Sequence, residues 1–341
     1  MASFLVAVSD SVFPNLDPAR EVLAKVGAEL RVAADPTPLA ILQVARDADA
    51  ALVTYAKITS DIIHKMTKCR IISRFGIGVD NVDIAAATNA SIVVTRVPDY
   101  CMDEVSDHTL ALLLALARKI PFANSRAHAG RWEMAAVTPI HRLRGRVLGL
   151  VGFGRIPRMV APKAQAFGLE VLTYDPYVSR EETAKASVDK VEFDALVKAS
   201  DYISIHVPLM PETNFLFGAD TFARMKPTAY LINTARGPVV DEGALARALD
   251  AGQLAGAALD VLSLEPPPSN SPLFGRDNVI LTPHTSFYSE ESLVELQIKA
   301  AEEVVRVLTG QAPRNPVNPE ALKSTRETTL IGDRRTSNGL L

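Results

Sequence analysis

Two blocks of short apolar segments, separated by helical stretches, constrain the fold of this chain more than any other feature. Such alternation is typical of parallel α/β units, because parallel strands need a crossover that is usually a helix. Strands that are apolar throughout also suit a sheet covered on both faces. We expect strands in the first block at residues 4–8, 50–55, 70–75 and 91–98, and in the second at 147–152, 170–175, 202–207, 229–235, 256–261 and 279–283.

The helical stretches divide into three kinds. Residues 103–120 are apolar nearly all round with carboxylates in the first turn, which predicts a long buried helix at a domain or subunit interface. Residues 121–132 predict a more polar helix. Residues 290–308 predict a helix that returns to the first block, since that block is short of helices to cover its sheet.

Composition excludes several classes of protein. The formal net charge of −3 gives no basic field for nucleic acid, and the longest apolar run, residues 110–117, is too short to span a membrane. Cys69 and Cys101 fit neither a metal spacing nor a disulfide framework, which indicates a reducing compartment. We expect no signal peptide, because the apolar stretch among the first residues is short and no basic residue precedes it. We therefore expect a cytoplasmic protein without a metal, a membrane span or a nucleic-acid partner.

A glycine turn predicts a dinucleotide site. Gly152 and Gly154 follow an expected strand and open an expected helix, so the backbone can approach a pyrophosphate at the helix N-terminus. Asp175 ends the next strand about 20 residues downstream, where a carboxylate binds ribose hydroxyls and repels a 2′-phosphate. This arrangement favours NAD over NADP. Pro157 replaces the third glycine and is tolerable in a first helical turn, whereas Pro162 should kink the helix.

Three polar residues follow late strands of the second block, where open α/β sheets place ligands. Arg236 can grip a carboxylate and polarise a carbonyl, and His284 can exchange a proton with a hydroxyl. Glu265 can fix the tautomer of an imidazole and stabilise its charged form. These are the groups that oxidation of a 2-hydroxy acid requires. Each of the three could instead be an ordinary surface or loop residue. His206 is a second candidate for the acid/base role of His284.

The sequence resembles the D-isomer-specific 2-hydroxyacid dehydrogenases over roughly residues 45 to 317. The resemblance rests on NTARG at residues 233–237, the glutamate before prolines at 265–268, and TPH at 282–284. RFGIGVDNVD at residues 74–83 and the segment 97–119 are similar to the branch of C-terminal-binding-protein-like and phosphoglycerate dehydrogenase-like proteins.

The resemblance implies two Rossmann-like, doubly wound parallel-sheet domains with the active-site cleft between them. It implies a substrate-binding domain of residues 1–101 plus 288–318, an NAD-binding domain of 102–287, and a tail at 319–341 that we expect to be disordered. The family usually forms homodimers through the cofactor domain, which would account for the apolar helix at 103–120.

The resemblance also implies roles for individual residues. Arg236, Glu265 and His284 become the catalytic trio, with His284 as acid/base. The substrate carboxylate would meet the backbone N–H groups of Ile77 and Gly78, with Arg74, Arg236 and His284 also at the substrate. NAD would contact Gly152, Gly154, Arg155, Ile156, Asp175, His206, Val207, Pro208, Thr213, Thr234, Ala235, Arg236, Asp260 and His284.

Departures from the family pattern leave the substrate open. Pro157 and Pro238 stand at glycine positions, and Thr285, Ser286 and Phe287 follow His284 where the branch has small residues and then Trp. The sequence therefore predicts an NAD-dependent dehydrogenase of a small 2-hydroxy or 2-keto acid without naming it. Two alternatives stay open: an NAD(H)-sensing, corepressor-like protein with little turnover, and an enzyme of the same fold acting on phosphite or formate.

Overall fold

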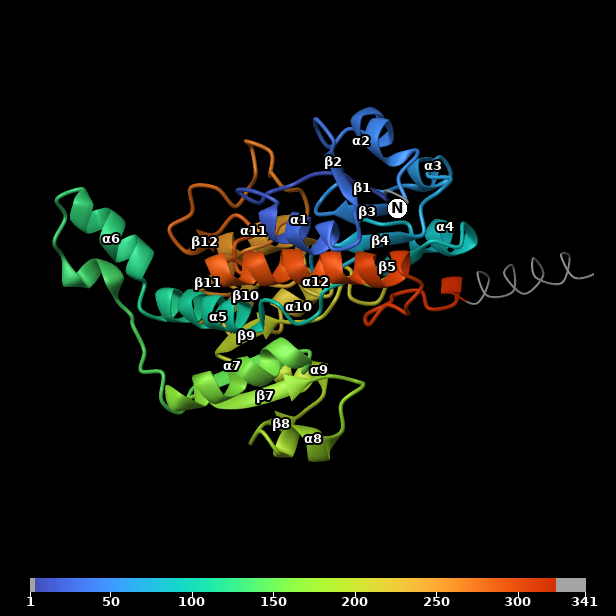
Figure 1. Ribbon diagram of the computed structural model, residues 1–341. Helices are drawn as coiled ribbons and strands as arrows, with labels where there is room; N and C mark the ends of the chain where they lie inside the picture. The colour runs from blue at the N-terminus through green and yellow to red at the C-terminus, as the bar shows by residue number, and fades with distance from the viewer. Residues whose placement is uncertain (1–3, 323–341) are drawn as a thin grey trace, which may run out of the picture. The chain divides into compact units, whose positions relative to one another are not determined.

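A computed structural model describes residues 4–322 of the chain (Figure 1). The described residues form two compact units, one reaching to Tyr100 and resuming at Ser289, the other comprising Cys101–Tyr288. Each unit is built on its own all-parallel sheet, so the α/β class expected from the sequence pattern is confirmed. Of the tail expected to be disordered, residues 319–322 form a turn with Ala321 buried, and the rest lies outside the described residues.

The sheet of the first unit has the strand order β2-β1-β3-β4-β5. The order in which successive strands are added reverses between β1 and β3, although all strands run parallel. Open α/β sheets bind ligands at such a switch point. The sequence pattern missed β2, because Leu30 is its one buried residue and charged side chains flank it. The strands are β1 (Leu5–Val8), β2 (Glu29–Val32), β3 (Ala50–Val53), β4 (Ile71–Arg74) and β5 (Val93–Thr95).

Helices cover both faces of this sheet. Alternate strand residues such as Ala7, Val53 and Ile72 pack against α2, α3 and α4. On the other face α12 packs on β3 and β4, and the Ser73 hydroxyl donates to the Ala300 carbonyl of α12 at 3.0 Å. The helices are α1 (Asp17–Ala24), α2 (Pro38–Ala45), α3 (Ser60–Ile63), α4 (Ile84–Asn89) and α12 (Glu290–Leu308).

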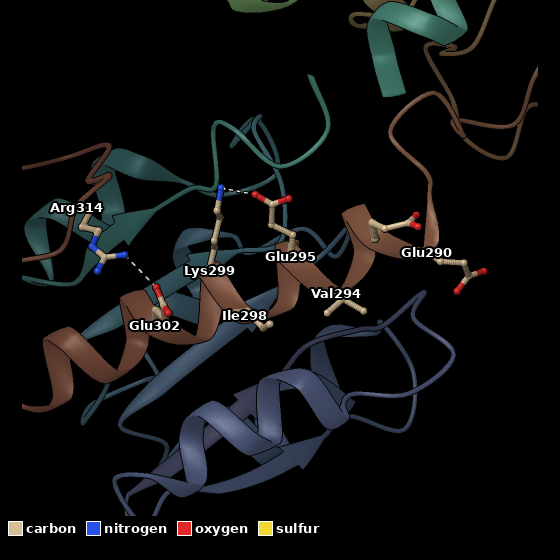
Figure 2. A pocket seen from close by; sticks show the side chains of 8 residues that line it. Glu290, Val294, Glu295, Ile298, Lys299, Glu302 and Arg314 are labelled. Carbon is tan, nitrogen blue, oxygen red and sulfur yellow. Dashed lines mark hydrogen bonds and ion pairs between the residues drawn. The ribbon is translucent and has the colours of Figure 1, made fainter. Parts of the chain in front are cut away.

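The outer side of α12 carries a shallow groove of about 620 Å³. Figure 2 shows Val294 and Ile298 on the helix with charged side chains along it. Lys299 contacts Glu295 at 2.6 Å, and Arg314 contacts Glu302 at 2.9 Å. Both cations are thus engaged with carboxylates of the same helix.

The sheet of the second unit has the strand order β12-β11-β10-β9-β6-β7-β8. Its switch point lies between β6 and β9, the arrangement of a Rossmann sheet. The sequence pattern missed the two-residue strand β8, which is too short to show a pattern. The strands are β6 (Val147–Val151), β7 (Glu170–Tyr174), β8 (Asp189–Lys190), β9 (Tyr202–Ile205), β10 (Tyr230–Asn233), β11 (Gly256–Leu259) and β12 (Val279–Leu281).

Two apolar layers cover this second sheet. Leu148, Leu150 and Ile232 pack with α5 and α7, and Ile203 and Leu231 pack with α9, α10 and α11. Each layer uses alternate residues of the strands, as the pleat requires. The helices are α5 (Met102–Ala117), α6 (Ile120–His128), α7 (Arg155–Ala166), α8 (Arg180–Ala184), α9 (Phe193–Ala199), α10 (Ala219–Phe222) and α11 (Glu242–Asp250), with 3-10 turns η1 (Met134–Val137) and η2 (Gly237–Val239).

Two features of these helices bear on function. α5 is buried along much of its length, as its apolar sequence predicts, whereas α6 has no buried residue. Within residues 4–322, no helix combines the length and apolar character needed to cross a bilayer.

Candidate functional site

The glycine turn lies at the switch point of the second sheet. Gly152 has φ +95°, a conformation that glycine adopts without strain. A Cβ there would lie 3.0 Å from the His206 carbonyl oxygen at the end of β9. Gly152 therefore lets the ends of β6 and β9 come together, which is a structural reason for this glycine.

Gly154 is the N-cap of α7 and serves a different purpose. A Cβ built on it would meet no protein atom within 4 Å, so the protein itself does not require glycine here. Open space at a helix N-terminus, where N–H groups and the helix dipole favour anions, fits a pyrophosphate. Arg155 is exposed and Ile156 half-buried in the first turn of α7. Pro157 is buried as the third residue of this turn, and α7 continues past Pro162 to Ala166.

Asp175 follows β7 and is tied to the glycine turn. One carboxylate oxygen accepts the Phe153 N–H at 2.8 Å, and the other accepts the Tyr177 N–H at 2.8 Å. A carboxylate has about four acceptor positions, so two remain for ribose hydroxyls. Asp175 thus stabilises the turn while keeping the capacity that the sequence assigned to it.

The residues after β9 form a loop beside the glycine turn. Burial lowers the pKa of His206 to about 3, so its imidazole is neutral at physiological pH, and Nε2 lies 2.9 Å from the Ser204 hydroxyl. Thr213 closes the loop by donating to the Pro208 carbonyl at 2.7 Å and accepting from the Met210 N–H at 2.8 Å. A histidine that resists protonation is poorly suited to act as an acid/base. Val207 is half-buried and Pro208 exposed.

The loop after β10 carries Arg236. Asn233, fully buried, accepts the Ala235 N–H at 3.0 Å and donates to the Arg236 carbonyl at 2.9 Å, which fixes the backbone around the arginine. The Thr234 hydroxyl lies 3.0 Å from that of Thr109 on α5. The Arg236 Nη1 donates to the Ala235 carbonyl at 2.7 Å. Asn233 belongs to the NTARG motif but was given no role of its own, although Asn commonly holds turns in this way.

Glu265 and His284 lie in contact, as expected for two members of the trio. Glu265 Oε2 is 2.6 Å from His284 Nδ1, and Oε1 accepts the Leu262 N–H at 2.9 Å. The carboxylate therefore favours the tautomer with the proton on Nδ1, in which Nε2 is the acceptor nitrogen of the neutral imidazole. Their side chains retain 34% and 24% of their exposure respectively, so the pair is accessible. The Phe287 ring stands edge-on to His284, with centroids 5.9 Å apart.

The Arg236 loop and the Glu265 loop touch through backbone. A Cβ on Gly237 would lie 2.0 Å from the carbonyl carbon of Leu262 and 2.4 Å from the Ser263 nitrogen. No residue other than glycine fits this approach without a backbone shift. Gly237 therefore fixes the spacing between the segment that carries Arg236 and the segment that carries Glu265.

Asp260, expected to contact NAD, organises the turn that presents His284. Its carbonyl accepts the His284 N–H at 2.8 Å. Its carboxylate accepts the Thr282 hydroxyl at 2.6 Å and the N–H groups of Thr285 and Ser286 at 2.9 Å each. Three of about four acceptor positions are thus used, and the side chain has no solvent exposure, so the carboxylate serves the turn itself.

The first unit holds the residues expected at the substrate carboxylate. Arg74 ends β4, where Nη1 donates to the Phe75 carbonyl at 2.8 Å and the guanidinium lies over the Tyr55 ring. Ile77 and Gly78 follow in a half-buried loop. The sequence reading overlooked Asp10, which accepts the Tyr55 N–H at 2.6 Å at this sheet's switch point. Tyr55 and Arg74 thereby meet at the carboxyl ends of β3 and β4.

Four kinds of group follow the carboxyl ends of strands in the second unit. They are the open N-terminus of α7, the Asp175 carboxylate, the Glu265–His284 pair and the Arg236 guanidinium. Such groups can receive an anion, accept hydroxyl protons and exchange a proton. Within the described residues, no group of three His, Cys, Asp or Glu side chains is arranged to hold a metal ion.

Comparison with known proteins gives the same picture. The family model described as "D-isomer specific 2-hydroxyacid dehydrogenase, NAD binding domain" matches residues 110–286. The D-3-phosphoglycerate dehydrogenase of Methanocaldococcus jannaschii is 40% identical over 307 residues, which are 89% of this chain and 58% of that protein. The glyoxylate reductase of Korarchaeum cryptofilum is 36% identical over 294 residues, 85% of this chain and 89% of that protein.

A solved structure agrees. The D-lactate dehydrogenase of Aquifex aeolicus, in complex with NAD and lactic acid, has a TM-score of 0.82 and 28% identity, and the match covers 94% of this chain and 98% of that one. The chain spans a little over half the length of the phosphoglycerate dehydrogenases it matches. With a family model over more than half of its length and a relative matched almost end to end, the chain belongs to the D-isomer-specific 2-hydroxyacid dehydrogenase family of oxidoreductases and carries that family's NAD-binding domain.

Proposed function

We propose that this protein is an NAD-dependent dehydrogenase that moves a hydride between the nicotinamide and C2 of a small D-2-hydroxy or 2-keto acid. The observation that supports this most is the 2.6 Å contact between His284 Nδ1 and Glu265 Oε2 at the carboxyl ends of a Rossmann sheet. When bound, NAD supplies the hydride acceptor, and NADH the donor. In oxidation, His284 Nε2 takes the hydroxyl proton while Glu265 stabilises the imidazolium; in reduction, the proton returns to the oxygen.

We assign the substrate's charge to cationic and backbone groups. The planar guanidinium of Arg236 binds the carboxylate and polarises the C2 carbonyl. Ile77 and Gly78 offer backbone N–H groups to the same carboxylate, and Arg74 adds a positive charge. Charge-assisted hydrogen bonds of this kind orient a small acid, because its carboxylate is its largest recognition element.

We assign NAD to the residues around the switch point of the second sheet. The open space at Gly154 and the two remaining acceptor positions on Asp175 support pyrophosphate and ribose binding there. Because a carboxylate repels a 2′-phosphate, NAD is preferred over NADP. The remaining contacts are assigned to Gly152, Arg155, Ile156, His206, Val207, Pro208, Thr213, Thr234, Ala235, Arg236, Asp260 and His284.

The substrate class comes from the relatives, whose names include D-3-phosphoglycerate dehydrogenase, glyoxylate reductase and D-lactate dehydrogenase. A panel of glyoxylate, hydroxypyruvate, phosphohydroxypyruvate and pyruvate, followed at the NADH absorbance with NADH and NADPH, tests the proposal. We expect turnover with at least one of them and a preference for NADH. NADH binding without turnover of any acid would contradict the proposed dehydrogenase activity and favour an NAD(H)-sensing protein. Oxidation of formate or phosphite would favour an enzyme of the same fold with that substrate.

We propose a homodimer formed through the cofactor domain. The support is the segment after α5: α6 has no buried residue, and Trp132 and Met134 are 90% and 83% exposed. Large exposed apolar side chains at one place mark interaction surfaces. Light scattering on the purified protein should give twice the chain mass; a monomer at micromolar concentration would contradict the proposal.

The cytoplasmic location stays a prediction. Its support is that Cys69 and Cys101 are both buried thiols, as a reducing compartment allows. Cell fractionation of the host would test it.

A further inference from the structure

His108 of α5 reaches the turn that presents His284. Its Nε2 lies 3.1 Å from the hydroxyl of Thr282 and 3.7 Å from Asp260 Oδ1, and its side chain keeps 24% of its exposure. Thr282 in turn lies 2.6 Å from the same Asp260 oxygen. The three side chains form a continuous hydrogen-bonded chain that begins on a helix and ends on a carboxylate without side-chain exposure.

The direction of each hydrogen bond in this chain follows from counting protons. The Thr282 hydroxyl has one proton, and the Asp260 carboxylate, an acceptor already serving two backbone N–H groups, attracts it at 2.6 Å. The hydroxyl oxygen must then accept from His108, so His108 carries its proton on Nε2. The histidine is thus a donor at the start of the chain.

The carboxylate at the other end holds a backbone that would not persist alone. His284 has φ +53°, in the left-handed region that a non-glycine residue adopts only when its surroundings fix it. Asp260 provides that fixation through its carbonyl to the His284 N–H and its carboxylate to the N–H groups of Thr285 and Ser286. Whatever orients the Asp260 carboxylate therefore orients the His284 imidazole.

We propose that His108 is a positioning residue for His284, acting through Thr282 and Asp260. By donating to Thr282 it commits the hydroxyl proton to Asp260 and holds that carboxylate in the plane that the turn requires. The kinetic part of this proposal rests on the acid/base role proposed for His284, whereas the structural part does not. His108 itself exchanges no proton with the substrate.

Amide hydrogen exchange tests the structural part without turnover. His108→Leu removes the donor, His108→Gln keeps an N–H donor of similar reach, and Thr282→Val removes the hydroxyl at nearly constant volume. Losing one net hydrogen bond should speed exchange at residues 284–286 about tenfold in His108→Leu and Thr282→Val, while exchange elsewhere in the unit is retained. His108→Gln should restore most of the protection, and the exposed His64→Leu is the control for a lost histidine.

Kinetics then test the consequence for catalysis. His108→Leu should lower kcat about tenfold with an NADH Kd within about threefold of wild type, and adding Thr282→Val should cause little further loss. Unchanged exchange at residues 284–286 in both single variants, or a His108→Gln variant as impaired as His108→Leu, would overturn the proposal. If the wild type shows no turnover while exchange still responds as expected, the proposed function fails and the positioning role stands.

Discussion

Replacing Gly237 with alanine tests the arrangement that joins two parts of the site. The added Cβ would lie 2.0 Å and 2.2 Å from the Leu262 carbonyl carbon and oxygen and 2.4 Å from the Ser263 nitrogen. All three are backbone atoms that no side-chain rotation can move away. The loop that leads to Glu265 must shift by about 1 Å or more to reach van der Waals separation.

The size of the effect follows from that shift. Overpacking typically costs about 1–3 kcal/mol, and three backbone contacts place Gly237→Ala at about 3 kcal/mol. For a unit of this size, that lowers Tm by about 6–12 °C. A displacement of about 1 Å between catalytic groups can cost about a hundredfold in rate, so kcat should fall by that order.

Calorimetry and the NADH-linked assay measure the two effects. Gly243→Ala on α11 is the matched control, because its Cβ meets neighbouring side-chain atoms at an ordinary 3.4 Å. A helix gains about 0.5–1 kcal/mol from this exchange, so the control should be neutral or stabilising. A Gly237→Ala protein with wild-type Tm and wild-type kcat would refute the reasoning.

Two further predictions separate structural from binding roles. Gly154→Ala should leave Tm unchanged but weaken NADH binding about tenfold or more, because the added Cβ fills space that is empty of protein. Gly152→Ala, at φ +95°, should lower the free energy of unfolding by about 1–3 kcal/mol. A Gly154→Ala protein that loses stability but keeps its NADH affinity, with the opposite result for Gly152→Ala, would be evidence against the assignment. The pKa of His206 is lowered to about 3 in the folded protein, whereas an unfolded histidine binds a proton from about pH 6.5 downward. The free energy of unfolding should therefore decrease as the pH is lowered from about 6.5 toward 3. Between pH 7.5 and 5.0, urea unfolding of the protein without cofactor should show about 2 kcal/mol more loss in wild type than in His206→Gln; equal losses would mean that His206 is not desolvated.

Much of the fold could be predicted from local pattern. The helix at residues 290–308 ends where the pattern ends, and Ser289 caps it as a polar residue before an apolar run should. β2 was not predicted, because it is buried by α1 and β1 and its own charged sequence shows no strand pattern. Pro157 was expected to be tolerable in the first turn of α7, and it lies there as a buried residue.

The candidate site was less predictable, because its contacts join distant residues. Glu265 and His284 could be paired by chemistry and by resemblance, but no sequence pattern links Gly237 to Leu262, or Asp260 to Thr285. These pairs are 25 residues apart, and they meet only after the parallel sheet has aligned the ends of its strands. The sequence pattern likewise gives His108 no role, because its contact with Thr282 joins residues 174 positions apart.

The most direct test of hydride transfer with His284 as acid/base is the turnover of His284→Asn at saturating NADH with the best acid of the panel. General acid–base catalysis contributes about 10²–10⁴-fold, so kcat should fall within that range, while NADH Kd stays within about threefold of wild type. If the variant keeps kcat within about threefold of wild type, the role assigned to His284 is wrong.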